Sequence, residues 1–125
     1  MEIPLLKLKK SCDFVETTEA FIKEHNLDGV VAVDETAGVS SINAATKSGL
    51  RIPEDLSVIG FTNGVLSQNS YPKMTTVSQH AQKIGKTTAK ILIDKLELRA
   101  ERYLPDTKVI KTSIVERGST KSTKK

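Results

Sequence analysis

The stretch GLRIPEDLSVIGF, residues 49–61, decides the fold of this chain. Gly49 closes a helical pattern, because glycine takes the left-handed conformation after a helix C-terminus without strain. Pro53 prevents a helix from running across it and keeps the preceding residue extended. The run from Leu56 to Phe61 is short and rich in β-branched residues, which is typical of a buried strand. The stretch therefore predicts a helix end, a short loop and a central strand, as in a parallel α/β unit.

The length and composition are those of one domain. The chain has 125 residues, 38% of them hydrophobic, which supports a single modest core. No apolar run approaches the roughly 18 residues that span a membrane, and the opening residues lack the charge order of a signal peptide. Cys12 is the only cysteine and is expected to be a small buried side chain. A disulfide within the chain is therefore impossible, which fits a reducing cytosol.

The net charge of +4 does not by itself indicate a nucleic-acid-binding protein. The lysines are spread along the chain and are densest near its end. Residues 117–125 contain no apolar side chain, which predicts a basic, flexible, solvated tail. No recognition motif accompanies this tail.

The residues before the deciding stretch predict two strand–helix units. GVVAV is continuously apolar, as in a parallel strand buried on both faces. Asp13 and Glu16 form a possible capping box for a helix, and His25 lies near that helix's C-terminal end, where it would cap the helix or interact with its dipole. The elements predicted in this part are strands over 3–9 and 29–33 and helices over 14–25 and 36–48.

Beyond the central strand the pattern predicts a loop, a helix and a final strand. Residues 62–74 are rich in turn formers and contain Pro72, which predicts a loop, and a loop of this length is often functional. Short strands are predicted over 75–79 and, at an edge of the sheet, over 109–115. Between them, a helix over 81–98 has an apolar stripe made of Ile84, Ile91, Leu92 and Leu96.

Two carboxylates follow the predicted strand 29–33 directly. Asp34 and Glu35 open the next helix, where acidic groups interact favourably with the helix dipole. They also lie at the carboxyl end of a strand, where open α/β sheets bind their ligands. A structural role at the helix end and hydrogen bonding to a polar ligand are equally good interpretations of this pair.

Motifs for catalysis and metal binding are not found. IGKTT, residues 84–88, is similar to the end of a phosphate-binding loop, but His80 stands where that loop needs a glycine. The segment also fits a helical pattern. His25 and His80 lack metal-ligand spacing with each other or with Cys12, and no G-x-S-x-G turn occurs. We therefore expect no enzyme activity, metal or cofactor.

A family resemblance rests on three segments that come in the family's order and with its spacing. They are GVVAVDETAGVSSINAATKSGLRIPEDLSVIGF, PKMTTVSQ and the terminal VERGST. They resemble the effector-binding core of the lactose/galactose-repressor (LacI/GalR) family of bacterial transcription regulators. The resemblance implies a periplasmic-binding-protein type I fold, in which two α/β subdomains hold the effector between them. We therefore expect a parallel sheet with helices on both faces, forming mostly the C-terminal subdomain.

The resemblance also implies a domain organisation and a set of ligand contacts. Residues 1–116 correspond to part of the effector-binding and dimerisation domain, and helix 81–98 corresponds to the other subdomain. The family's Asn-Asp pair corresponds to Asp34-Glu35, so Glu35 takes the ligand-contacting position. Two other polar positions of the family match Asn63 and Gln79. For Gln79, hydrogen bonding within the strand and hinge is an equally good interpretation.

The function implied is the ligand-sensing and dimerisation part of a transcriptional regulator. Its partners would be a small effector, such as a sugar, a second copy of the chain and operator DNA. DNA would be bound only through an N-terminal helix-turn-helix that this sequence does not contain. The alternative is a sugar-binding transport receptor of the same fold, and an enzyme on an unrelated doubly wound fold is a distant third.

Overall fold

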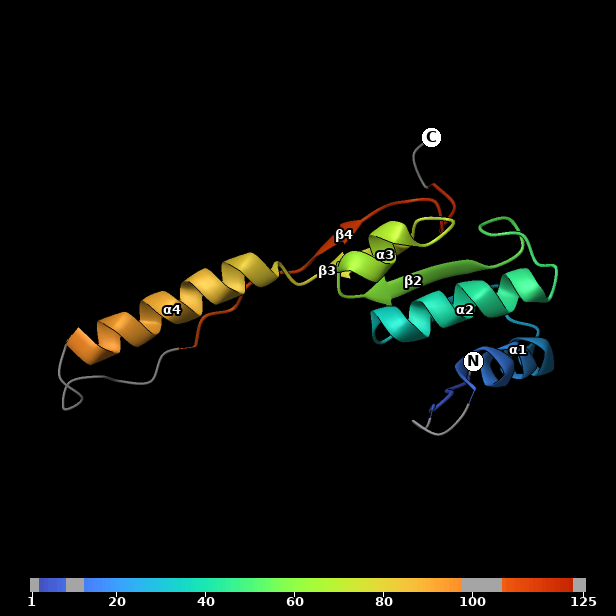
Figure 1. Ribbon diagram of the computed structural model, residues 1–125, viewed down its shortest axis with the longest axis horizontal. Coiled ribbons are helices and arrows are strands. Elements are labelled where there is room, and N and C mark those ends of the chain that lie inside the picture. Colours follow the sequence, from blue (N-terminus) through green and yellow to red (C-terminus); the bar gives the residue numbers. More distant parts are fainter. Residues whose placement is uncertain (1–2, 9–12, 98–106, 123–125) are drawn as a thin grey trace.

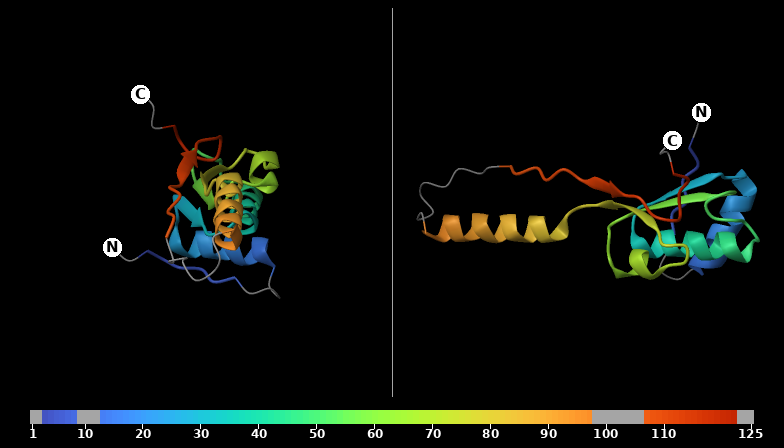
Figure 2. Two further views of the ribbon diagram at one scale, coloured as in Figure 1. Left: turned by 90° about the vertical axis from the view of Figure 1, so that its left-hand side faces the viewer. Right: turned by 90° about the horizontal axis from the view of Figure 1, so that it is seen from above.

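The computed structural model describes residues 3–8, 13–97 and 107–122, and its elements alternate between helix and strand (Figure 1). A four-stranded sheet and three helices form a layered body, and a fourth helix extends away from it (Figures 1 and 2). The elements are α1 (Phe14–His25), β1 (Gly29–Ala32), α2 (Glu35–Lys47), β2 (Ser57–Phe61), α3 (Val65–Asn69), β3 (Thr75–Ser78), α4 (Ala81–Glu97) and β4 (Ser113–Val115).

The sheet has the strand order β1-β2-β3-β4. β1, β2 and β3 pair in parallel, with Val30 opposite Val58 and Ile59 opposite Thr75. β4 pairs antiparallel with β3 at the edge of the sheet, as the pattern of residues 109–115 predicts, although the strand is shorter. Because three neighbouring strands run in one direction, the residues that follow them meet at one edge, called the carboxyl edge below.

The stretch that decides the fold takes the predicted conformation. Gly49 has a φ of +77°, and the N–H groups of Gly49 and Leu50 donate to carbonyls in the last turn of α2. Leu56 is fully buried at the entry to β2. Between them, Arg51 and Asp55 form an ion pair with an N–O distance of 2.7 Å. The loop is therefore held at both ends, and β2 enters the centre of the sheet.

α1 has the predicted bounds, and Asp13 caps its start as predicted. The Asp13 carboxylate accepts hydrogen bonds from the N–H groups of Val15 and Glu16. At the other end Asn26, not His25, forms the cap, with a φ of +47°. His25 lies in the last turn and packs edge-on against Phe21 at 4.5 Å between ring centroids.

The helices that pack on the described sheet lie on one face. α2 packs on β1 and β2, and α1 and α3 each pack on α2 (Figure 2). The other face is largely open, so Val31 is 83% exposed. The α/β class and the parallel pairing are confirmed, but the described helices cover one face of the sheet and not both faces as predicted. The prediction that strand 29–33 is buried on both faces is also wrong. Its apolar run reflects a face that no described helix covers.

The core lies between α2 and the sheet and is centred on Met74. This side chain is fully buried among Ile42, Leu56 and Val58. Its sulfur and terminal methyl group lie where side chains at Gly38 and Gly60 would otherwise be. The two glycines thus bring α2 close to β2 and leave space that the flexible methionine fills.

Three predicted segments differ from the structure. Residues 3–8 do not form the predicted strand, because they pair with no strand of the described sheet. The predicted loop 62–74 contains the short helix α3. The predicted solvated tail is wrong for its first part, because Ser119 is fully buried and bonded to the sheet. Cys12 and residues 123–125 lie outside the described residues.

α4 confirms the helix predicted over 81–98, apart from residue 98, which lies outside the described residues. The helix points away from the sheet, and none of its residues is buried (Figures 1 and 2). Leu92 is 56% exposed and Leu96 is 73% exposed. The apolar stripe therefore does not fold back onto the sheet of its own chain.

Candidate functional site

The carboxyl edge brings the four predicted site residues to one side of the sheet. Asp34 and Glu35 follow β1, Asn63 follows β2 and Gln79 follows β3. Asp34 is the N-cap of α2, where its Oδ1 accepts a hydrogen bond of 2.8 Å from the N–H of Ala37. The structural interpretation of Asp34 is therefore confirmed. Its second carboxylate oxygen has no partner among the described residues.

Glu35 reaches across the edge and holds α3. Its Oε1 accepts hydrogen bonds from the N–H groups of Gly64, at 2.6 Å, and Ser67, at 3.1 Å. Gly64 is the N-cap of α3 and has no side chain to perform this function. A side chain on Gly64 would collide with the Glu35 carboxylate. Glu35 thus supplies, from another helix, the cap that α3 lacks.

The surroundings of Glu35 favour its ionised form. Burial acts to raise the pKa of this carboxyl group. Hydrogen bonds from Ser67 and from the backbone of Gly64 outweigh burial and hold the pKa below its ordinary value. The ionised carboxylate of Glu35 therefore forms its contacts within the protein, where it links α2 to α3.

Asn63 is held by an arginine that sequence reasoning did not select. Nη2 of Arg117 donates to Oδ1 of Asn63 at 2.5 Å, and Oγ1 of Thr76 donates to the same oxygen at 3.3 Å. Nη1 of Arg117 also donates to the carbonyl of Met74 at 2.7 Å. Arg117 belongs to the VERGST segment, so the family resemblance was the one sequence signal that pointed to it.

Gln79 is linked to the same edge through Thr62. Its Nε2 donates to Oγ1 of Thr62 at 3.3 Å. Thr62 has a φ of +88°, which is rare for a β-branched residue, and its N–H donates to the carbonyl of Val77. Backbone strain of this kind is common at ligand sites. Thr62 is a second residue at this edge that sequence reasoning missed, because no local pattern marks its conformation.

The segment after Arg117 is hydrogen-bonded to β2 and to β3. Oγ of Ser119 accepts a hydrogen bond from the N–H of Thr75 at 2.8 Å and donates to the carbonyl of Val58. Oγ1 of Thr120 lies 2.8 Å from Oγ1 of Thr75. These contacts bridge β2 and β3 near their start, so the C-terminal segment fixes the strands whose ends form the carboxyl edge.

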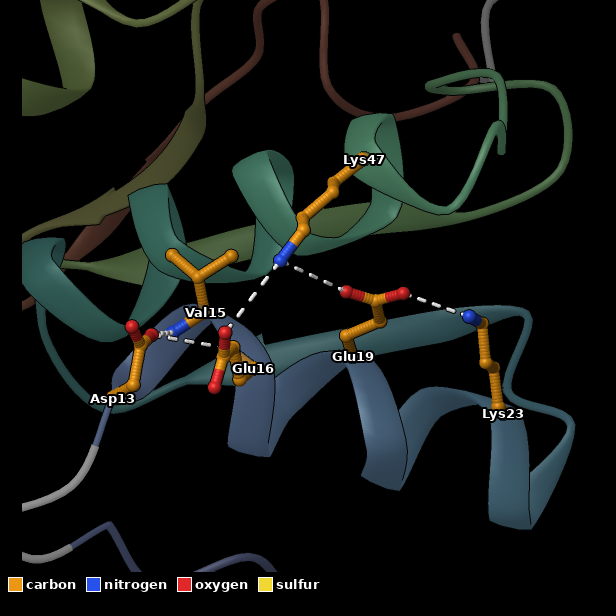
Figure 3. Close-up of polar contacts among 6 residues, drawn as sticks. All are labelled: Asp13, Val15, Glu16, Glu19, Lys23 and Lys47. Carbon is orange, nitrogen blue, oxygen red and sulfur yellow. Dashed lines mark hydrogen bonds and ion pairs between the residues drawn. The ribbon is translucent and has the colours of Figure 1, made fainter.

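A second polar cluster lies between α1 and α2, away from this edge (Figure 3). Lys23 pairs with Glu19 at 2.7 Å, and Lys47 lies between Glu16 and Glu19 at 3.9 and 3.7 Å. The Lys23 partner lowers the pKa of Glu19. These charges neutralise one another across a shallow hollow of about 380 Å³. The arrangement is that of a surface ion-pair network.

The other chemical classes considered from the sequence receive no support. Gly85 and Lys86 lie inside α4, so residues 84–88 do not form a phosphate-binding loop. In the described part of the chain, no three His, Cys, Asp or Glu side chains are grouped as metal ligands. No helix of that part is long and apolar enough to cross a membrane.

The parallel strands with polar residues at their carboxyl ends define a class of ligand-binding α/β domains. The sequence profile of one such family, the periplasmic binding protein-like domain, matches residues 8–120. The chain belongs to this family. Its relatives are helix-turn-helix transcriptional regulators of the LacI/GalR type, which are not enzymes.

Three relatives illustrate the similarity. The HTH-type transcriptional regulator RegA of Clostridium acetobutylicum is 30% identical over 115 residues, which cover 90% of this chain and 33% of RegA. The transcriptional regulator CelR in complex with cellobiose has a TM-score of 0.75 and 26% identity over 85% of this chain and 32% of that chain. A LacI family regulator from Arthrobacter sp. FB24 in complex with lactose has a TM-score of 0.76 and 26% identity over 86% and 40% of the two chains.

These relatives are regulators, which favours the regulator over the transport receptor considered from the sequence. The chain spans about a third or less of the length of the curated relatives RegA and CelR. The functions of those longer proteins are therefore proposals for this chain.

Proposed function

We propose that this chain is the ligand-sensing part of a LacI-type transcriptional regulator and that it binds a small polyhydroxy effector at the carboxyl edge. The observation that carries the proposal is the set of polar side chains that follow β1, β2 and β3 at one edge of the sheet. Solved relatives in complex with cellobiose and lactose support a sugar as the effector.

The free polar atoms at this edge suit hydroxyl groups, which both donate and accept hydrogen bonds. Three atoms at the edge have no hydrogen-bond partner among the described residues. They are one carboxylate oxygen of Asp34, the amide oxygen of Gln79 and the amide nitrogen of Asn63. Glu35 would act indirectly, by holding the loop that follows β2, because its contacts lie within the protein.

Closure around the effector would involve α4. This helix begins two residues after Gln79, and its exposed apolar stripe is suited to packing against another surface. In a two-subdomain protein, an effector that binds the closed arrangement more tightly shifts the population towards it. DNA binding would belong to a part of the protein other than this chain, and the protein would act in the bacterial cytoplasm.

A homodimer is proposed as the working state. Neither α1 nor α2 has a large exposed hydrophobic side chain that could serve as a dimer contact. Val65 and Leu66 of α3 and the stripe of α4 are exposed instead. These surfaces fit self-association better than the charged face between α1 and α2 (Figure 3).

Calorimetric titration with cellobiose, lactose and ribose tests the proposed site. Asn63→Ala should weaken the binding of whichever sugar the unmodified chain binds, because it removes an amide from the edge. Asn43→Ala changes the same residue type on the exposed side of α2 and serves as the control. Equal weakening by both variants, or no effect of Asn63→Ala on a sugar that binds, would contradict the proposed site.

A further inference from the structure

The contact with Arg117 decides which end of the Asn63 amide, the oxygen or the nitrogen, points towards the carboxyl edge. A guanidinium group can only donate hydrogen bonds, so the atom 2.5 Å from Nη2 must be the amide oxygen. The hydroxyl of Thr76 also faces this oxygen, at 3.3 Å, while its Oγ1 accepts from Nη1 of Arg117 at 3.2 Å. The guanidinium contact therefore fixes the amide orientation, and the Thr76 hydroxyl is placed to donate to the same oxygen.

The amide nitrogen of Asn63 is then the atom left for other partners. It has no hydrogen-bond partner among the described residues. Among the described residues, the buried side-chain nitrogen and oxygen atoms that lack a partner are Oγ1 of Thr18 and Oγ of Ser48. The amide nitrogen of Asn63 is not one of them, so it is not buried. The nitrogen therefore reaches solvent as a donor of two hydrogen bonds.

Arg117 is itself firmly placed. Its backbone N–H donates to Oγ1 of Thr75 at 2.8 Å, and its Nη1 donates to the carbonyl of Met74 at 2.7 Å. Two residues later, Ser119 is fully buried. The arginine is therefore fixed at both its backbone and its side chain before any ligand arrives.

We propose that Arg117 is a positioning residue that sets ligand specificity by turning Asn63 so that it presents a hydrogen-bond donor. This inference rests on the proposed function. The group of the effector that meets Asn63 is then an acceptor, such as a hydroxyl or ring oxygen. An aspartate at position 63 would keep the contact with Arg117 and would present an acceptor instead.

Nuclear magnetic resonance tests the positioning without a ligand. The side-chain NH₂ signals of Asn63, identified by their loss in Asn63→Asp, should move in Arg117→Met and should stay unchanged in Arg51→Met. Arg51 is a suitable control because it pairs with Asp55 in the loop before β2. Unchanged Asn63 signals in a folded Arg117→Met variant would overturn the proposal.

Affinity for the best-binding sugar among cellobiose, lactose and ribose gives the second measurement. Loss of one hydrogen bond corresponds to roughly a threefold to tenfold weaker Kd. We expect this loss in Asn63→Asp, which remains folded because Arg117 keeps a partner, and a smaller loss in Arg117→Lys. Full affinity of Asn63→Asp would overturn the proposal. If no sugar binds the unmodified chain, the proposed function fails, and the NMR signals still decide the role of Arg117.

Discussion

Replacing Glu35 with alanine tests how the carboxyl edge is built. The substitution removes the acceptor for the N–H groups of Gly64 and Ser67. A hydrogen bond to a charged group contributes about 1.5–3 kcal/mol, and loss of a helix cap costs about 0.5–2 kcal/mol. Glu35 is only half-buried, so water replaces part of what is lost. We therefore expect the free energy of unfolding to fall by about 2–3 kcal/mol.

Thermal and urea unfolding, followed by circular dichroism, measure this loss. It corresponds to a decrease in Tm of about 8–15 °C for a chain of this size. Glu35→Gln keeps an acceptor oxygen without the charge and should lose about half as much. Glu24→Ala, on the exposed side of α1, is the control and should change Tm little.

The pH dependence gives an independent check on the charge. Folding lowers the pKa of Glu35 from its ordinary value of 4.5. Its contribution to stability is therefore complete above that value and is lost as the pH falls through the folded pKa. The stability difference between the unmodified chain and Glu35→Gln should accordingly be constant near neutral pH and should shrink in acid.

One result would refute this reasoning about Glu35. If Glu35→Ala unfolds at the same temperature as the unmodified chain but no longer binds the effector, the carboxylate is a direct ligand contact. That outcome would restore the expectation drawn from the family resemblance.

Three further predictions concern other parts of the chain. Ser119→Ala should destabilise the chain by about 1–3 kcal/mol in urea unfolding, because the N–H of Thr75 loses its buried acceptor; an effect as small as that of Ser113→Ala, an exposed change, would contradict this role. The chain should self-associate at micromolar concentration through α4, and Leu92→Lys with Leu96→Lys should give a monomer in sedimentation; a monomeric unmodified chain would count against it. Binding of DNA should be weak, sequence-independent and salt-sensitive, and a specific band shift that survives raised salt would refute this.

The elements that were predicted well are those set by local chemistry. Asp13 at a helix start, Gly49 at a helix end and the apolar run of β2 each decide a conformation within a few residues. Such signals depend on propensity and hydrophobic spacing, which the sequence displays directly. The bounds of α1 could therefore be read correctly without knowledge of the rest of the fold.

The features that were missed depend on residues far apart in the chain. α3 begins where Glu35, from another helix, caps it, so residues 62–74 look like a simple loop in the sequence. Arg117 and Ser119 looked like part of a solvated tail because their partners lie in β2, β3 and the loop between these strands. The exposure of Val31 likewise depends on which face of the sheet is covered. A one-dimensional pattern does not contain these pairings.

Met74 has a consequence for how this sequence can evolve. Its side chain occupies the space that a β-carbon at Gly38 or Gly60 would need. A mutation that adds a side chain at either glycine would therefore require the flexible end of Met74 to move aside or position 74 to become smaller. The three positions are therefore coupled, so that the effect on stability of a side chain at position 38 or 60 depends on the residue at position 74.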